Sequence, residues 1–220
     1  VNLLKALIEI KTQQDSSLTF RCGCKSGVCG SCAVRVNGVE RLACKTNIQN
    51  CDFIEPIKNT TIIKDLVVNV SHETLLIKRI NSSIVEDVKN DEVNQEDIKK
   101  IDLQSNCILC SSCYSSCPVY DVNKEFLGPF ALTRALRYVN DKRLVDKATI
   151  LDSIQSNGIW DCTLCSACTL VCPQNIDPKG DIMQLQNISV QFGYSNPYKQ
   201  DFGFDGNFED DFGGFNPNSF

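Results

Sequence analysis

The chain has 220 residues, of which 42% are apolar and 22% are charged, so its composition is that of a globular protein and excludes wholesale disorder. A formal net charge of −5 argues against binding to the phosphate backbone of a nucleic acid. No apolar run approaches the length of a membrane-spanning helix. Because the sequence opens with Val1 directly in a helical pattern, we expect it to be incomplete at its N-terminus, where a targeting signal would be invisible.

Cysteine is the most informative residue type, with 14 copies. A disulfide framework and a metal framework are the two candidate explanations. Disulfide-dense domains are usually short secreted chains that cannot build a core, whereas this chain is long enough to build one. Thiols that stand two residues apart converge on a shared metal more readily than they pair with distant cysteines. The spacing therefore favours metal binding and a reducing compartment.

The first third of the chain has the pattern of a small α+β domain. Residues 2–14 carry an apolar stripe at helical spacing and are predicted to form a helix. Residues 33–36 and 39–43 are short strand candidates on either side of Asn37-Gly38, the strongest local signal for a hairpin. Residues 62–70 form a further apolar stretch. We place the domain boundary near residue 74.

The rest of the chain has a helical pattern and ends in a tail. Residues 81–100 are charged and are expected to hold a linker and part of a helix. Pro129 opens a predicted helix, since proline is favoured at the first helical position, and residues 144–154 are expected to form another. Residues 192–220 are acidic and rich in Phe, Gly and Asn, which predicts a disordered tail. A docking peptide anchored by Phe is the alternative for this tail.

The first cysteine motif has the spacing C-x4-C-x2-C-x11-C. This is the plant-type ferredoxin spacing for a [2Fe–2S] cluster. The glycines among the cysteines allow the unusual backbone angles that a loop around two irons needs, and the predicted hairpin fills the eleven-residue gap and returns the last cysteine to the first three. A zinc site is the alternative, but zinc sites normally pair two C-x2-C units. The predicted [2Fe–2S] ligands are Cys24, Cys29, Cys32 and Cys44.

The second and third motifs are two copies of C-x2-C-x2-C-x3-C-P, 55 residues apart. In this bacterial two-cluster run the fourth Cys of each copy ligates the cluster of the other copy. One predicted [4Fe–4S] cluster is ligated by Cys107, Cys110, Cys113 and Cys172. The second is ligated by Cys117, Cys162, Cys165 and Cys168, with a [3Fe–4S] cluster as the alternative.

The remaining candidates give weak signals. Cys22 and Cys51 are surplus to these twelve ligands and are interpreted as unligated thiols. His72, the single histidine, is interpreted as a surface residue, and Trp160 as packing near the third motif. The sequence contains no nucleophile motif, phosphate loop or dinucleotide fingerprint. We therefore predict an electron carrier without a catalytic residue or substrate site of its own.

The motifs together resemble the iron–sulfur subunit of succinate dehydrogenase and fumarate reductase. The resemblance covers about residues 1–190, and it is carried by G-C-K-S-G-V-C-G-S-C at 23–32, L-A-C at 42–44, I-I-K-D-L-V-V at 62–68, C-I-L-C-S-S-C-Y-S-S-C-P at 107–118, Gly128-Pro129, and C-P-Q-N-I-D-P at 172–178. It implies an N-terminal β-grasp [2Fe–2S] domain at residues 1–74, without its first two strands. It also implies an all-α two-cluster ferredoxin domain at residues 75–191.

The resemblance also implies a function. Succinate is oxidised, or fumarate reduced, at the FAD of a separate flavoprotein subunit. Electrons then pass through three clusters in line to a quinone at a membrane-associated subunit. The implied location is the periphery of a membrane, with the cytoplasmic face favoured over the periplasmic face.

Three departures bear on the quinone. The usual family has a non-cysteine residue in place of Cys165 and a three-iron cluster beside the quinone. It also has a His where this chain has Thr163, and a Trp pair where this chain has Asp121 and Val122. These features resemble the variant group with a Cys-rich third subunit, which includes methylmenaquinol:fumarate reductases, and they imply that the quinone is reached only indirectly.

Two other functions remain open at this point. One is the iron–sulfur subunit of a heterodisulfide or thiol-driven fumarate reductase complex. The other is a redox sensor that uses its clusters as a switch, which needs a partner-binding or DNA-binding module, and no basic helix–turn–helix pattern is evident.

Overall fold

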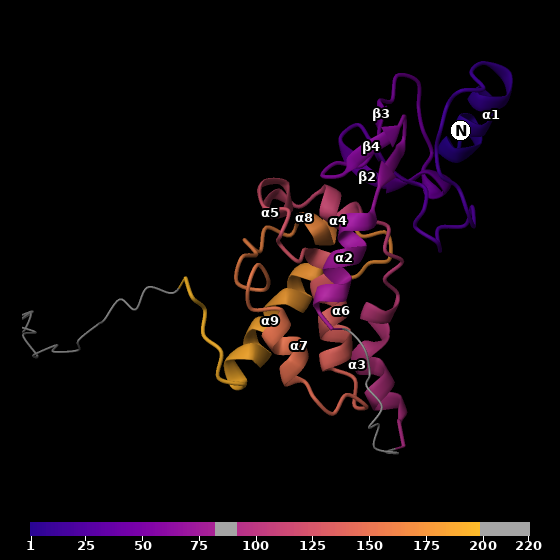
Figure 1. Ribbon diagram of the computed structural model, residues 1–220. Coiled ribbons are helices and arrows are strands. Elements are labelled where there is room, and N and C mark those ends of the chain that lie inside the picture. Colours follow the sequence, from indigo (N-terminus) through magenta and orange to yellow (C-terminus); the bar gives the residue numbers. More distant parts are fainter. Residues whose placement is uncertain (82–91, 199–220) are drawn as a thin grey trace, which may run out of the picture.

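The computed structural model describes residues 1–81 and 92–198 of the chain, which form two parts in contact (Figure 1). A small part with a helix and two short sheets comes first, and a larger helical part follows it. Each part has its own apolar core. The predicted α+β fold class is confirmed.

The first helix is α1 (Leu3–Gln13), as predicted from its apolar stripe. The Asn2 side chain caps it by accepting a hydrogen bond from the Lys5 backbone N–H at 3.2 Å. The leucines on its inner face are buried against the first hairpin. The helix thus provides one wall of the core behind the first cysteine motif.

The predicted hairpin is also confirmed. Strands β1 (Ala33–Val36) and β2 (Val39–Leu42) pair antiparallel, and β3 (Ile54–Glu55) completes a sheet of order β2-β1-β3. Asn37 and Gly38 both have positive φ, 51° and 81°, as a two-residue hairpin turn of type I′ requires. Beyond the sheet, β2 continues into the short 3-10 helix η1 (Ala43–Lys45). The apolar stretch at 62–70 forms a second hairpin, β4 (Thr61–Lys64) with β5 (Val67–Asn69).

The helical part is built around α6 (Pro129–Val139), the helix predicted to open at Pro129. Its long neighbours are α9 (Pro178–Gln191) and α3 (Gln95–Ser105), and α2 (Ser71–Arg79) lies against it (Figure 1). The remaining helices are short: α4 (Ser112–Ser115), α5 (Pro118–Val122), α7 (Ala148–Ser153) and α8 (Ala167–Leu170).

Three sequence-based boundaries differ from the structure or fall outside it. The helix expected over residues 144–154 is limited to α7, because the Asp146 carboxylate accepts hydrogen bonds from the backbone N–H groups of Ala148 and Thr149 and so starts the helix there. Part of the stretch at 81–100 lies outside the described residues. Residue 74 lies inside α2, whose inner face packs in the core of the helical part.

The beginning of the expected tail is folded onto the helical part. Tyr194 packs against the core, and its hydroxyl donates a hydrogen bond to Asp152. The Tyr198 hydroxyl donates to Asp161 at 2.8 Å. These aromatic anchors correct the prediction of disorder for residues 192–198, and residues 199–220 lie outside the described residues.

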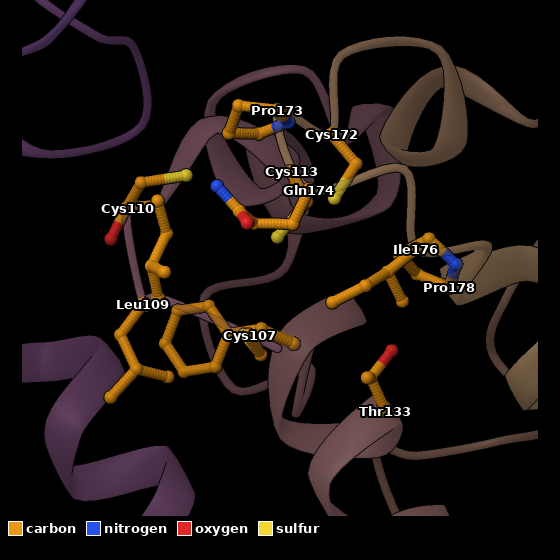
Figure 2. A pocket seen from close by; sticks show the side chains of 13 residues that line it. Cys107, Leu109, Cys110, Cys113, Thr133, Cys172, Pro173, Gln174, Ile176 and Pro178 are labelled. Atoms are coloured by element: carbon orange, nitrogen blue, oxygen red, sulfur yellow. The ribbon is translucent and has the colours of Figure 1, made fainter. Parts of the chain in front are cut away.

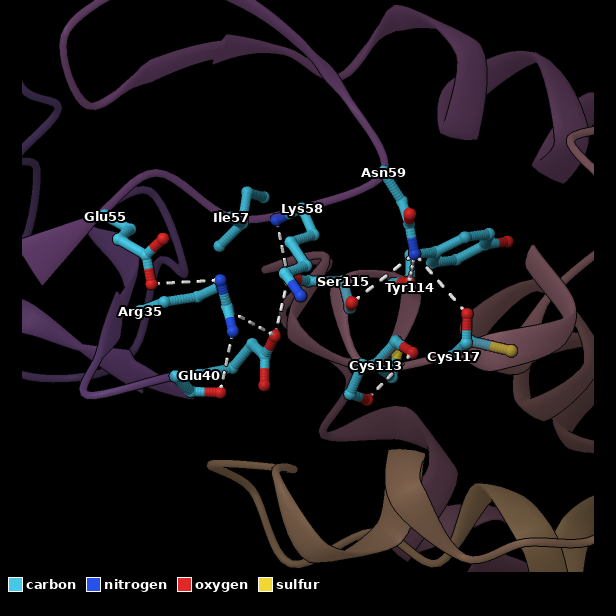
Figure 3. A network of polar contacts seen from close by, with 12 residues as sticks. Arg35, Glu40, Glu55, Ile57, Lys58, Asn59, Cys113, Tyr114, Ser115 and Cys117 are labelled. Carbon is cyan, nitrogen blue, oxygen red and sulfur yellow. Dashed lines mark hydrogen bonds and ion pairs between the residues drawn. The ribbon is translucent and has the colours of Figure 1, made fainter. Parts of the chain in front are cut away.

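A buried polar network joins the two parts (Figure 3). The Ser115 hydroxyl on α4 donates to the Glu40 carboxylate on β2 at 2.7 Å and accepts from the Lys58 backbone N–H, also at 2.7 Å. The Asn59 amide donates to the Tyr114 carbonyl oxygen at 2.9 Å. The small part is therefore fixed against α4, which lies within the second cysteine motif.

Candidate metal centres

The first cysteine group lies on the loop between α1 and β1. The Cys24 sulfur accepts hydrogen bonds at 3.3–3.4 Å from the backbone N–H groups of Ser26, Val28 and Cys29. The Ser26 side chain and these N–H groups lower the pKa of Cys24 to about 5. The loop therefore stabilises a thiolate at this position before any metal is considered, as a cluster ligand requires.

The hairpin brings the last cysteine of this group to the loop. Ala33 pairs with Leu42 in the register of the hairpin, and the Ala43 N–H donates to the Cys32 carbonyl oxygen at 3.0 Å. Cys32 and Cys44 consequently lie next to each other in the core of the small part. Burial, together with the neighbouring Cys44, raises the pKa of Cys32 to about 11.

The second group of cysteines surrounds one cavity in the helical part (Figure 2). Its four members are Cys107, Cys110, Cys113 and Cys172. Phe130, Ile176 and other apolar side chains complete the wall of the cavity. Burial raises the pKa of the first three of these thiols. Four converging thiols in an apolar cavity match the surroundings of a cluster bound by thiolates.

The third group repeats this local geometry. Leu164 and Ser166 have positive φ values of 54° and 69°, as Leu109 and Ser111 have 52° and 61° in the second group. Helices α4 and α8 then follow at equivalent positions. The internal sequence repeat is therefore also a repeat of backbone conformation.

The third group also places its four thiols near one another. Burial raises the pKa of Cys168 to about 12, and the neighbouring Cys162, Cys117 and Cys165 contribute to the rise. Burial also raises the pKa of Cys117, and the neighbouring Cys165 adds to the rise. Cys117 thus lies with the three cysteines of the later motif, although it comes from the earlier one.

The donor sets fit iron–sulfur clusters better than a single metal ion. All 14 cysteines lie within the described residues and are free thiols. Within residues 1–81 and 92–198, no three His, Cys, Asp or Glu side chains are gathered closely enough to hold one ion. The ligands of a cluster bind different irons and stand further apart than the four ligands of zinc. Bound iron would also supply the positive charge that keeps buried thiolates ionised.

The remaining predicted residues take ordinary positions. Cys22 and Cys51 are exposed. His72 is exposed and forms a hydrogen bond with the Lys124 carbonyl oxygen at 2.8 Å. The Trp160 indole N–H donates to Gln155 at 2.8 Å while its ring packs against the core of the helical part.

Sequence reasoning missed the residues that connect the centres. Glu40 and Ser115 are buried at the contact between the two parts, and Gln174 donates to the Gly27 carbonyl oxygen at 3.0 Å. Gln174 directly follows Cys172-Pro173, which is the one signal that could have pointed to it. Glu40 carries no such signal, because a charged side chain is rarely fully buried unless it is paired.

Comparisons with known proteins agree with this geometry. A 2Fe-2S iron-sulfur cluster binding domain matches residues 1–74, and a 4Fe-4S dicluster domain matches residues 104–176. A chain of the Mycobacterium smegmatis Sdh1 complex has the same fold, with a TM-score of 0.77 at 22% identity, over 90% of this chain and 87% of that chain.

Curated relatives are more similar in sequence. The fumarate reductase iron-sulfur subunit of Haemophilus influenzae is 36% identical over 203 residues, which cover 83% of this chain and 79% of the relative. The 8-methylmenaquinol:fumarate reductase iron-sulfur subunit of Wolinella succinogenes is 35% identical, with 87% and 65% covered. A mitochondrial succinate dehydrogenase [ubiquinone] iron-sulfur subunit of rice is 34% identical, with 86% and 71% covered.

The two domains and their cysteine groups define an iron–sulfur electron-transfer protein with 2Fe–2S and 4Fe–4S binding domains. The sequence identity to the curated relatives, and the share of each chain that is covered, also show which family of such proteins the chain belongs to. The chain belongs to the family of iron–sulfur subunits of fumarate reductase and succinate dehydrogenase. The family predicted from the motifs is thereby confirmed, and the relatives' names do not favour the heterodisulfide or thiol-driven alternative.

Proposed function

We propose that this chain carries electrons between an FAD-containing flavoprotein subunit and a third, quinone-linked subunit of a complex that interconverts succinate and fumarate. The observation that carries the proposal is the succession of three groups of four cysteines, with the first loop in contact with the second group. The relatives' names support the substrate class, since they are subunits of fumarate reductases and a succinate dehydrogenase. Bound iron–sulfur clusters would supply one-electron redox chemistry.

The proposed ligands divide by domain. Residues 1–74 bind the [2Fe–2S] cluster, and residues 75–191 bind two cubane clusters. The ligands of the first are Cys24, Cys29, Cys32 and Cys44. The ligands of the second are Cys107, Cys110, Cys113 and Cys172. The ligands of the third are Cys117, Cys162, Cys165 and Cys168. The mutual proximity of the thiols within each group supports this division.

The third cluster is proposed to be of the [4Fe–4S] type. A cubane needs four ligands, and the third group offers four thiols where a three-iron cluster needs only three. The matching backbone angles on either side of Cys110 and Cys165 support an equivalent role for the two.

The complex is proposed to lie at the periphery of a membrane, on its cytoplasmic face, with a membrane-associated or Cys-rich third subunit. Thr163 and Asp121 stand where the usual family carries quinone-adjacent side chains, which supports indirect delivery to the quinone. The relative from Wolinella succinogenes, named a methylmenaquinol:fumarate reductase subunit, supports a complex of this variant type. Among the described residues, no helix combines the length and the apolar character that crossing a membrane requires.

The proposal is tested by purifying the complex anaerobically through a tag on this chain. We expect a co-purifying flavoprotein, fumarate reduction with a reduced viologen donor, and about ten iron atoms per chain from one [2Fe–2S] and two [4Fe–4S] clusters. Electron paramagnetic resonance (EPR) of the reduced complex should show all three centres.

A ligand variant provides the internal control. Cys29→Ala should abolish the [2Fe–2S] signal and leave both cubane signals, whereas Cys51→Ala, another exposed cysteine, should change none. Iron near two atoms per chain, or loss of every signal in the Cys29 variant with retained folding, would contradict the ligand sets. Absence of fumarate reduction together with intact clusters would contradict the substrate class instead.

A further inference from the structure

The loop of the first cysteine group touches the second group at Gly30. A Cβ atom built on Gly30 would lie 2.7 Å from the Ile108 carbonyl oxygen and 2.9 Å from the Cys110 Cβ. Separations below 3 Å are too short for real Cβ contacts, so any side chain at position 30 would push the two loops apart. Gly30 also has φ of +72°, which glycine adopts without strain. The Gly30 backbone therefore packs directly against the Ile108 carbonyl group and the Cα and Cβ atoms of Cys110, with no side chain between the two loops.

Further packing holds this contact in place. Ile108 and Cys110 belong to the helical part, yet they pack against the apolar core of the small part, which includes Cys32 and Cys44. Cys110 therefore lies on the side of the second group that faces the first group.

A second contact joins the same two groups by a longer path. The Gln174 side-chain amide donates to the Gly27 carbonyl oxygen at 3.0 Å. Gln174 reaches Cys172 only through its own side chain, Pro173 and two peptide bonds. Gly30, in contrast, is bonded directly to Cys29 and contacts Cys110 itself, so the path at Gly30 crosses one non-bonded contact and far fewer covalent bonds.

We propose that the Gly30–Cys110 contact is the route by which electrons pass between the first and second centres, and that Gly30 is a positioning residue whose missing side chain sets the closeness of this route. The inference rests on the proposed ligand sets. One electron leaves one centre and enters the other, so one is oxidised and the other is reduced. No covalent bond forms or breaks, and no proton is required.

The test compares Gly30→Ala with Gly27→Ala in the purified complex. Both glycines belong to one loop and have positive φ, so both variants carry the same kind of backbone strain. The three atoms nearest to a Cβ on Gly27 all belong to the flexible Lys45 side chain, which can move away. Comparing the two variants therefore separates two effects. One is the steric clash of a new Cβ between the loops, and the other is backbone strain within the first loop.

Two readouts report on the contact. The first is the spin–spin interaction between the two reduced centres, measured by EPR. The second is the rate of electron exchange between them after a rapid redox jump, followed by freeze-quench EPR. In Gly30→Ala we expect a weaker interaction and a several-fold slower exchange, with cluster content and both reduction potentials unchanged. In Gly27→Ala we expect both readouts to stay close to those of the unsubstituted complex.

Gln174→Ala tests the rival path and does not depend on how Gly30→Ala folds. We expect the exchange rate to be unchanged when this amide is removed. A several-fold slower exchange in Gln174→Ala, or an unchanged rate and unchanged interaction in Gly30→Ala, would overturn the proposed route. Absence of one of the two signals from the unsubstituted complex would instead contradict the ligand sets on which the inference rests.

Discussion

The Ser115 hydroxyl donates a hydrogen bond to the Glu40 carboxylate at 2.7 Å, across the contact between the two parts of the chain. Glu40 also forms an ion pair with Arg35, whose Nε lies 3.3 Å from the carboxylate. Both Glu40 and Ser115 are about 95% buried, with 5% and 4% of their surface exposed. Because Ser115 stands between Cys113 and Cys117, this hydrogen bond ties the small part to the segment that carries ligands proposed for two different clusters (Figure 3).

Removing the Ser115 hydroxyl should loosen the contact between the two parts. Ser115→Ala leaves the Lys58 N–H without its partner and leaves the buried Glu40 carboxylate with Arg35 alone, which costs about 1–3 kcal/mol of unfolding free energy. For a chain of this size, 1 kcal/mol lowers the melting temperature by about 2–4 °C. The measurement is anaerobic thermal unfolding at a fixed scan rate.

Ser116→Ala is the matched control for this prediction. The Ser116 hydroxyl donates only to the Cys113 carbonyl oxygen at 3.2 Å, within one turn of the chain. Its removal should lower the melting temperature less than Ser115→Ala does. Equal decreases for the two variants would show that the Glu40 contact adds nothing to stability.

Gly128 should not tolerate a side chain. Its φ and ψ of 78° and 170° fall in a region that is essentially restricted to glycine, and a Cβ atom would lie 2.1 Å from the Tyr114 ring. Tyr114 cannot retreat, because it is fully buried and its hydroxyl donates to the Leu127 carbonyl oxygen. Strain and overpacking together should cost Gly128→Ala about 3 kcal/mol or more.

Gly193→Ala separates these two contributions. Gly193 also has a positive φ, 91°, but among residues 1–81 and 92–198 nothing lies within 4 Å of the position of its Cβ. This variant should lose only about 1 kcal/mol from backbone strain and retain all clusters. The check is cluster content together with the melting temperature, and a loss in Gly193→Ala as large as that in Gly128→Ala would rule out the contact with Tyr114 as the cause.

Asp181 should make stability fall as the pH rises. Its carboxylate, buried between α9, α3 and α6, accepts hydrogen bonds from Gln104 at 2.8 Å and Thr133 at 2.7 Å. Burial raises the pKa of Asp181 above its usual value in spite of these bonds. The folded chain therefore binds the Asp181 proton more tightly than the unfolded chain does. The stabilisation from this group is full below the unfolded pKa of about 3.9, and it is lost as the pH rises through the folded pKa.

The measurement for Asp181 is the difference in unfolding free energy between the wild type and Asp181→Asn across pH. As the pH rises, the unfolding free energy of the wild type should fall relative to that of Asp181→Asn. The difference between the two should become constant above the folded pKa of Asp181. Asp141→Asn should give a pH dependence of opposite sign, since hydrogen bonds and charge from Arg143 lower the pKa of Asp141. If the wild type instead became more stable relative to Asp181→Asn as the pH rises, the raised pKa of Asp181 would be contradicted.

Local sequence signals predicted the elements that form each centre. Asn37-Gly38 predicted the hairpin because both residues must have positive φ, and the structure has both. The two cysteine runs predicted a repeat, which extends to the backbone angles around Cys110 and Cys165. These features depend on residues close together in the sequence, so a pattern of a few residues suffices.

Contacts between the parts were not predictable in the same way. Glu40 is a charged residue and so is expected to be exposed, but it is buried, and one of its partners is Ser115, 75 positions later. The composition of residues 192–220 predicts a disordered tail that includes Tyr194, but the Tyr194 ring packs against the core of the helical part. In both cases the deciding partner lies far away in the sequence, where no local pattern reports it.

The last prediction concerns the third cluster and Cys165. Leu164 and Ser166, both with positive φ, hold the Cys165 backbone as Leu109 and Ser111 hold that of Cys110. We therefore expect a [4Fe–4S] cluster with Cys165 as a ligand, and no strong three-iron EPR signal from the oxidised complex prepared without air. Cys165→Ala should lose one iron and produce that signal while the second cluster stays intact. Cys110→Ala, the equivalent change in the other run, should alter the second cluster and leave the third. A strong three-iron signal in the unsubstituted complex, unchanged in Cys165→Ala, would show that Cys165 is not a ligand.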